Sequence, residues 1–419
     1  MKRASSAIFF LTIGLLATQP PASAAQQHRK KSVPPAASRR AQPPAKPAAR
    51  DGEAEARLIE VYRLVGQAQG REALTKAGAL VKDHPNFQLA QLVYGDLLTA
   101  QARPLRTLGD VPDSTAKAAA ASLTELREES QMRLKALRER PPAGAIPSQF
   151  LALSPRNKHA IAVDASRSRL YLFENSPAGL KLIADYYISV GKLGIEKSVE
   201  GDLRTPLGVY FITSNLDPKT LKDFYGSGAL PINYPNPYDL RRGKTGGGIW
   251  LHGTSSSQFS RPPKATDGCV AMANPDLERI IRTVEVRTTP VVIAPQLRWV
   301  PAQSAKADGK PFEDALQAWR SAKSSGDINR TLSFYTPDFN SYGKSLAEWT
   351  PTLRGELDRT RGHDVTLKDL SYLRWTDGAD TMVVTFGEVV DGAKTGPTKR
   401  QYWMRQGSQW KIFFEGVIG

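Results

Sequence analysis

The sequence predicts a multidomain chain with a small α-helical N-terminal region, a β-rich central domain and an α+β cone at the C-terminus. Its 419 residues are enough for two or three domains of ordinary size. Helical periodicity dominates residues 52–142, whereas β-branched and aromatic runs separated by Gly and Pro dominate residues 150–297. From residue 309 to residue 419, three helical segments precede four strand-like segments, which is the order of an α+β domain.

Residues 1–24 have the pattern of a secretory signal peptide. Lys2 and Arg3 form a positive start, residues 8–17 are almost wholly apolar, and small residues end the segment at Ala22-Ser23-Ala24. The alternative is a retained membrane anchor, but the apolar run is shorter than the ~20 residues that span a bilayer. We therefore expect cleavage after Ala24 and a location outside the cytoplasm.

Residues 25–51 are predicted to be a basic, proline-rich linker. Five prolines and seven Lys or Arg occur between residues 25 and 50, without any acidic residue. Such a composition cannot bury a core, and proline stiffens it. Two interpretations stay open: a solvated spacer, or a peripheral electrostatic contact with an anionic membrane surface or envelope polymer.

The net charge of +16 does not indicate a nucleic-acid partner. Nine of the 57 basic residues and none of the 41 acidic residues lie in residues 1–50, so much of the excess belongs to a tail. The single cysteine excludes a disulfide framework and cysteine-rich zinc modules. We expect no cofactor.

The helical region consists of apolar stripes at helical spacing within residues 58–98, interrupted at His84-Pro85. Residues 76–100 resemble a tetratricopeptide helix pair, with small residues at the contact and proline at the turn. Residues 114–140 are Ala-rich and charged without Gly or Pro, which predicts another helix. The region is either a docking module for an envelope protein or a helical collar packed on the next domain.

The central domain is predicted from a series of short strands. Two of them flank a polar turn at Ala165–Arg167, within residues 158–174, and the others follow at 182–191, 208–213, 248–253 and 287–294. Strands of this length between Gly/Pro turns favour a β-sandwich or barrel.

The only cysteine, Cys269, follows Thr266-Asp267-Gly268 and lies 17 positions after His252, which ends an apolar strand. This pair is suited to a thiolate nucleophile with a histidine base. The glycine before the cysteine would allow the amides of Gly268 and Cys269 to face an oxyanion. Two alternatives stay open: a buried cysteine beside a structural histidine, and a metal site formed by Cys269, His252 and Asp267.

These residues resemble a known family. His252-Gly253-Thr254 followed by the Thr266–Cys269 run resembles the signature of the L,D-transpeptidase (YkuD-type) catalytic domain. Residues 190–212 resemble the family's upstream G…K…GD…TP-x-G segment, so the resemblance covers roughly residues 157–297. It implies a β-rich domain and a periplasmic cysteine acyltransferase that acts on peptidoglycan stem peptides.

The resemblance also implies roles for individual residues. Cys269 would be the nucleophile and His252 its general base, with the backbone carbonyl of Gly253 orienting the imidazole. The amides of Gly268 and Cys269 would form the oxyanion hole, and Thr266 holds the family's Ser/Thr position.

Two positions depart from the family pattern. Asp267 stands where the family most often has His, and Ala271 stands where it most often has Arg or Asn. A carboxylate aimed at the sulfur would raise the pKa of the thiol, so we expect Asp267 to point elsewhere or to accept an amide hydrogen bond. This Thr-Asp-Gly-Cys variant resembles a proteobacterial subgroup with both transpeptidase and hydrolase roles, which leaves the acyl acceptor open.

Residues 215–248 form a long insertion directly before the strand of His252. Its aromatic and basic residues are suited to a lid over a carboxylate-bearing peptide, although a packed surface loop is the alternative. The candidate substrate-binding residues are Thr266, Asp267, Tyr225, Tyr234, Tyr238, Arg241 and Arg242, with Lys244 beside them.

A linker is expected at 298–308, before the C-terminal domain at 309–419. Residues 326–339 resemble the start of a nuclear-transport-factor-like (SnoaL-like) domain, a fold that does not fix a function. His363 and Asp364 could form a catalytic pair, but we expect them to start a strand at the surface. The functional alternatives are therefore an L,D-transpeptidase, an L,D-carboxypeptidase or amidase-type hydrolase with the same site, and a non-catalytic envelope adaptor.

Overall fold

The computed structural model describes residues 52–418. The predicted signal peptide at 1–24 and the linker at 25–51 lie outside these residues. Among the described residues, no helix is both long enough and apolar enough to cross a membrane.

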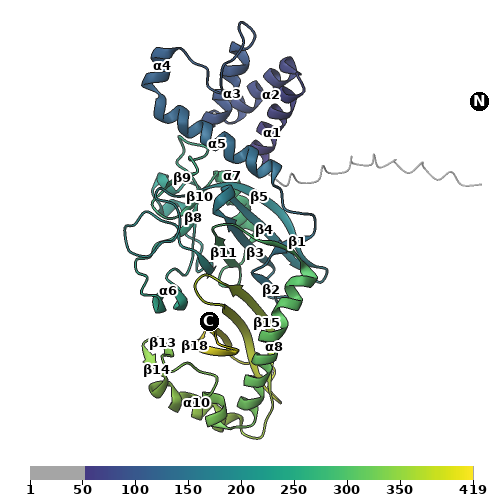
Figure 1. Ribbon diagram of the computed structural model, residues 1–419, viewed down its shortest axis with the longest axis vertical. Helices are drawn as coiled ribbons and strands as arrows, with labels where there is room; N and C mark the ends of the chain where they lie inside the picture. The colour runs from purple at the N-terminus through teal and green to yellow at the C-terminus, as the bar shows by residue number, and fades with distance from the viewer. Residues whose placement is uncertain (1–51, 419) are drawn as a thin grey trace, which may run out of the picture. The chain divides into compact units, whose positions relative to one another are not determined.

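The N-terminal region is helical, as predicted, and Pro85 lies in the turn between its second and third helices (Figure 1). Leu58, Val61, Leu80, Phe87 and Leu89 are fully buried between the helices, as predicted for the apolar stripes. Val65 and Leu98, which the same pattern assigned to the stripes, are instead 48% and 45% exposed. The helices are α1 (Glu53–Gly66), α2 (Gly70–Asp83), α3 (Gln88–Thr99), α4 (Asp113–Ala118) and α5 (Ala120–Arg138).

The central domain is built on a nine-stranded sheet with the order β6-β11-β3-β4-β5-β10-β8-β7, and β9 pairs with β5 (Figure 1). Most neighbours are antiparallel, but three pairs are parallel: β10 with β8, β11 with β3 and β9 with β5. The strands are β3 (His159–Asp164), β4 (Arg169–Ser176), β5 (Gly179–Gly191), β6 (Gly208–Phe211), β7 (Ala229–Pro231), β8 (Trp250–His252), β9 (Lys264–Thr266), β10 (Val270–Met272) and β11 (Pro290–Ala294); the helices are α6 (Pro237–Arg241) and α7 (Asn274–Thr283).

The C-terminal domain has helices on a five-stranded antiparallel sheet with the order β18-β17-β16-β15-β2, which confirms the predicted α+β cone. Its fifth strand, β2 (Phe150–Ala152), comes from the segment assigned by sequence to the catalytic domain. The other elements are α8 (Ala302–Ser324), α9 (Ile328–Leu332), β13 (Asn340–Ser341), β14 (Lys344–Ser345), α10 (Leu346–Thr360), β15 (Val365–Trp375), β16 (Thr381–Val390), β17 (Thr398–Gln406) and β18 (Gln409–Val417). His363 and Asp364 are exposed, as expected.

The segment 298–308 differs from the linker that the sequence suggested. Residues Trp299–Pro301 form β12, which pairs with β1 (Ala145–Pro147), and α8 begins immediately afterwards. Gly309 allows this helix to lie close to the sheet, because a Cβ there would be 2.9 Å from the ring of Tyr372. Residues 298–308 are therefore a short strand followed by the first turns of a helix, and contacts with distant segments hold them in place.

The interior of the cone contains a network of paired charges. The Lys323 ammonium lies 2.7 Å from both Glu356 and Glu388, and the Lys399 ammonium lies 2.6 Å from Glu356 and 3.1 Å from Glu415. Both lysines are almost completely buried. Buried charges persist only when they are paired, so these five side chains depend on one another.

Candidate active site

The register of β8 and β10 brings the predicted cysteine and histidine together. Ala271 pairs with His252 across the parallel strands, and Cys269 lies two residues before Ala271. Residues two apart along an extended segment face the same side, so Cys269 and His252 share one face of the sheet. The backbone N–H of Trp250 faces the Cys269 sulfur at 3.4 Å, and the thiol lies 3.5 Å from the carbonyl oxygen of Gly248.

His252 is oriented by its neighbour. Its Nδ1 lies 2.7 Å from the carbonyl oxygen of Gly253, the contact that the resemblance implied. Because a carbonyl only accepts, Nδ1 carries the proton and Nε2 is the free base. His252 is 1% exposed, and burial lowers its pKa to about 4, so the imidazole is neutral near pH 7. The ring of Tyr225 meets it edge to face at 5.2 Å.

Cys269 is partly buried and free. Burial raises the pKa of its thiol, and the Asp267 carboxylate adds to that rise. The Trp250 N–H and the positive charge of Arg261 act in the opposite direction without cancelling it. The resting pair is therefore a neutral thiol and a neutral imidazole, which requires proton transfer during attack instead of a preformed ion pair.

The turn before the cysteine is shaped by Thr266. Its hydroxyl donates to the carbonyl of Cys269 at 2.7 Å and accepts the N–H of Gly268 at 3.1 Å. The Gly268 amide therefore already donates a hydrogen bond to Thr266, in contrast to its predicted role in an oxyanion hole. Of the two amides predicted to bind an oxyanion, the Cys269 amide remains a candidate. Gly268 has a φ of +124°, and a Cβ there would lie 2.7 Å from the Arg204 carbonyl oxygen, so this turn requires glycine.

Asp267 points away from the sulfur, as expected. It is exposed and pairs with Lys192 at 2.9 Å. Within residues 52–418, no group of three or more His, Cys, Asp or Glu converges as a metal site would require, which does not support the metal alternative for Cys269, His252 and Asp267.

The upstream Gly-Asp…Thr-Pro segment, residues 201–206, packs against the turn that precedes Cys269. The Thr205 hydroxyl accepts the N–H of Gly191, and Asp202 accepts the N–H of Ser198 and pairs with Lys197 at 2.9 Å. These contacts fold the segment that brings the Arg204 carbonyl against Gly268. These backbone contacts explain why Asp202 and Thr205 occur in this segment.

The insertion at 215–248 has two ends with different contacts. Tyr225 lies 4.8 Å from the ring of Trp250, and its carbonyl oxygen accepts the Gly253 N–H, so this end borders the site. Tyr234 is buried, and its hydroxyl donates to the Thr245 carbonyl within the insertion itself.

The other end of the insertion binds the C-terminal domain, which corrects the prediction of a substrate lid there. The Tyr238 hydroxyl donates to the Asp377 carbonyl at 2.7 Å, and Arg242 pairs with the Asp377 carboxylate at 3.0 Å. Arg241 forms an ion pair with Asp338. Tyr238 and Arg241 on the short helix α6, and Arg242 directly after it, all contact the C-terminal domain. Lys244 is paired with the buried carboxylate of Asp239.

Asn274 is a site residue that the sequence did not reveal. Its Oδ1 accepts the N–H groups of Ser227 and Thr254, and its Nδ2 donates to the Thr254 carbonyl. A Cβ at Gly253 or Gly226 would lie 2.0 Å from this Oδ1. Asn274 therefore joins the insertion to the strand end that carries His252, and the two glycines were its only sequence signal.

Arg261 is the second residue that the sequence did not reveal. It is 6% exposed, donates to the Phe224 carbonyl at 2.8 Å and lies over the Phe224 ring at 4.0 Å. Across the described part of the chain, no ion pair links Arg261 to a carboxylate. Its buried positive charge acts on both candidate residues: it favours the thiolate of Cys269 and adds to the lowering of the His252 pKa. Its only signal was being the one arginine between His252 and Cys269.

The helical region holds the loop that carries Arg261. Phe259 stacks on Phe87 at 4.3 Å, and the Ser260 hydroxyl donates to Glu129 at 2.8 Å. The contacts of Phe87 and Glu129 favour the collar interpretation of the helical region. From the central domain, the Tyr187 hydroxyl on β5 donates to the carbonyl of Arg261 at 2.9 Å.

Comparison with protein families matched two segments of the chain. Residues 158–293 match the L,D-transpeptidase catalytic domain (YkuD), and residues 312–416 match the Cds6 C-terminal NTF2-like domain. No curated protein matched the chain in a sequence comparison.

Two solved structures share the fold over nearly all of their length. Bd1075 of Bdellovibrio bacteriovorus is 24% identical with a TM-score of 0.56, and the match covers 65% of this chain and 98% of that one. Pgp2 of Campylobacter jejuni, described as a helical cell shape determining protein, is 22% identical with a TM-score of 0.51, covering 70% and 99%. At these identities the likeness establishes the fold.

Proposed function

The chain carries an L,D-transpeptidase (YkuD) catalytic domain followed by an NTF2-like domain, and from this premise we propose that it is an exported cysteine acyltransferase acting on peptidoglycan stem peptides. The observation that carries the proposal is the placement of Cys269 on one face with a histidine whose Nδ1 is fixed by Gly253. A fixed tautomer with a free Nε2 is what a base for the thiol requires.

The first half of the reaction forms a thioester. Nε2 of His252 takes the thiol proton while Sγ of Cys269 attacks the carbonyl carbon before a D-residue. The Cys269 amide donates to the resulting oxyanion. When the tetrahedral intermediate collapses, the C–N bond breaks and His252 returns the proton to the leaving amine.

The second half transfers the acyl group. An amine of a second stem attacks the thioester carbon, and His252 removes a proton from that amine. The C–S bond then breaks, and His252 gives this proton to the sulfur, which restores the thiol. Arg261 stabilises the negative sulfur in both halves because its buried guanidinium carries no carboxylate partner within residues 52–418.

Hydrolysis is the second candidate, and Ala271 favours it. This side chain is buried beside His252, where the family most often has Arg or Asn, and its methyl group offers no donor to an incoming acceptor. With water as acceptor, the same thioester yields a shortened stem and a free carboxylate.

The proposal also includes place and role. The N-terminal pattern of a signal peptide and a peptidoglycan substrate both fit the periplasm. The description of Pgp2 as a cell shape determinant supports a role in cell shape for this chain as well.

Incubation of the purified protein with muropeptides, followed by mass spectrometry, tests the proposal. Cross-linked dimers that are absent with Cys269→Ala are expected from transfer. Trimmed monomers without dimers would show that the protein hydrolyses stem peptides and does not transfer them. If Cys269→Ala fully complements a deletion strain, the non-catalytic adaptor is correct and the enzyme proposal fails.

A further inference from the structure

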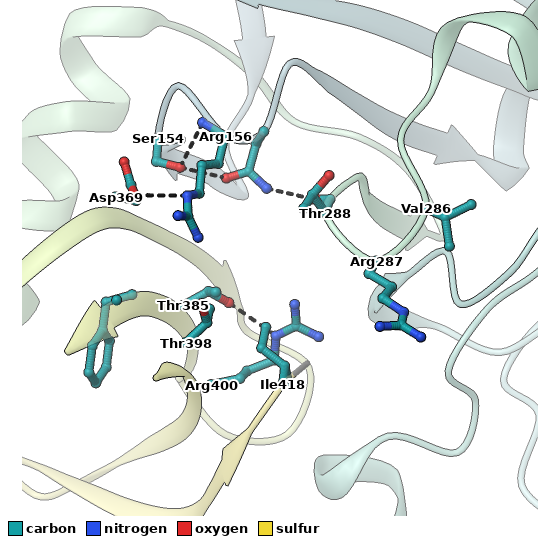
Figure 2. Close-up of a pocket in the computed structure, with 13 residues that line it drawn as sticks. Ser154, Arg156, Val286, Arg287, Thr288, Asp369, Thr385, Thr398, Arg400 and Ile418 are labelled. Atoms are coloured by element: carbon teal, nitrogen blue, oxygen red, sulfur yellow. Dashed lines mark hydrogen bonds and ion pairs between the residues drawn. The ribbon is translucent and has the colours of Figure 1, made fainter. Parts of the chain in front are cut away.

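We propose that a cleft between the catalytic and NTF2-like domains binds the free carboxylate end of a peptide, with Arg400 as its main binding residue. The cleft has a volume of about 280 Å³ and lies between the loop after α7 and the strands β15 to β17 (Figure 2). A neighbouring hollow of about 330 Å³ shares Arg287, Arg400 and Ile418 with it.

Arg400 is buried without a carboxylate. It is 8% exposed, its Nε donates to the Thr385 hydroxyl at 3.0 Å, and its guanidinium lies 3.3 Å from the centre of the Phe211 ring. In the region from residue 52 to residue 418, no ion pair involves Arg400. Burial lowers its pKa to about 10, since only tyrosines act against that effect. A buried guanidinium is costly without an anion, so its terminal nitrogens are available to one.

The cleft is lined by three arginines and one acidic residue. Arg156 and Arg287 also line it, and Figure 2 shows both guanidinium groups around the same hollow as Arg400. The one acidic lining residue, Asp369, is paired with Arg156 at 2.8 Å. Asp369 and Arg287 both have positive φ, at 53° and 71°, so the rim holds two strained residues.

The remaining lining indicates a peptide end instead of an inorganic anion. Hydroxyl groups of Thr385 and Thr398 stand beside an apolar wall of Phe386, Val286 and Ile418. A carboxylate fits the fork of a guanidinium, and the wall suits a small apolar side chain next to it. The residues that line the cleft are separate from those of the cysteine turn.

Isothermal titration calorimetry tests this with N-acetyl-alanyl-alanine, its C-terminal amide and inorganic phosphate as probes. The protein is the full mature chain with Cys269→Ala, which excludes turnover. We expect the acid to bind, the amide to bind at least tenfold more weakly, and Arg400→Met to lose roughly tenfold or more in affinity for the acid. Arg282→Met, which removes an exposed arginine on α7, is the matched control and keeps the affinity.

Thermal unfolding separates binding from a structural role. If Arg400 serves to bind an anion, Arg400→Met folds and, without ligand, is at least as stable as the parent.

The proposal fails if Arg400→Met has a lower melting temperature and the acid has no effect on the parent, because Arg400 would then have only a structural role. Equal binding of acid and amide, binding of phosphate alone, or unchanged affinity in Arg400→Met would also overturn it. If Arg400→Met does not fold, Thr385→Val is expected to weaken acid binding, and unchanged affinity there counts against the site.

Discussion

At the residue scale, Cys269 and His252 are both held in their neutral forms by burial. Burial raises the pKa of the thiol above its ordinary value of ~8.5 and lowers the imidazole to about 4. The alkylation rate of Cys269 by iodoacetamide should therefore rise through a midpoint above pH ~8.5. A midpoint near pH 5, typical of a thiolate–imidazolium pair, would contradict this arrangement.

Arg261 should set the position of that midpoint. Removing its charge with Arg261→Met is expected to raise the thiol pKa further, because a cation that favours the thiolate is lost. Asp267→Asn should lower the midpoint slightly, since it removes an opposing charge. Arg282→Met is the control with no expected shift, and an unchanged midpoint in Arg261→Met would refute the role of Arg261.

The pH profile of turnover should reflect His252. Because its pKa is about 4 in the folded protein, the base stays deprotonated down to mildly acid pH. The acid limb of kcat/KM is expected near pH 4, and a limb near pH 6.5 would show that the imidazole is not desolvated as described.

At the element scale, the helical region stabilises the loop between β8 and β9. Phe87→Ala removes the stacking partner of Phe259 and leaves a cavity, which should reduce stability by about 3 kcal/mol. Slower alkylation of Cys269 is expected with it, because the loop carries Arg261. Leu98→Ala, at an exposed position of α3, is the control. If Phe87→Ala loses stability but Cys269 is alkylated at an unchanged rate, the helical region does not influence the site through this loop.

At the scale of the whole molecule, acid stability should depend on the charges inside the cone. Burial alone would raise the pKa of Glu415, but Lys399 and Lys323 outweigh it and lower that pKa to about 2. The stabilisation is present above the ordinary value of 4.5 and is lost as the pH falls toward 2. Glu415→Gln should cost about 3 kcal/mol at pH 7 and flatten the melting temperature between pH 4.5 and 2. An equally steep pH dependence in Glu415→Gln would exclude Glu415 as its source.

Sequence alone predicted the elements whose pattern is local. The hairpin around Ala165–Arg167, the break at Pro85 and the four C-terminal strands follow from periodicity and turn residues. The contact of His252 with the carbonyl of Gly253 could be predicted because it joins neighbouring residues of a short motif.

Contacts between distant segments could not be predicted in the same way. Arg261 and Asn274 gain their roles from partners on other elements, and α6 turns Tyr238 toward the C-terminal domain. The strand β2 joins a sheet whose next strand lies more than two hundred residues later. The availability of the Gly268 amide for an oxyanion could not be predicted either. This N–H donates to the Thr266 hydroxyl within the same turn.

Intact-mass spectrometry of the protein with a carbapenem tests most directly whether Cys269 is a nucleophile that becomes acylated with His252 as its general base. The account predicts a covalent adduct on Cys269, none with Cys269→Ala, and formation slowed by ~10²-fold or more with His252→Ala. No adduct on the folded wild-type chain, or equal rates with His252→Ala, would contradict it.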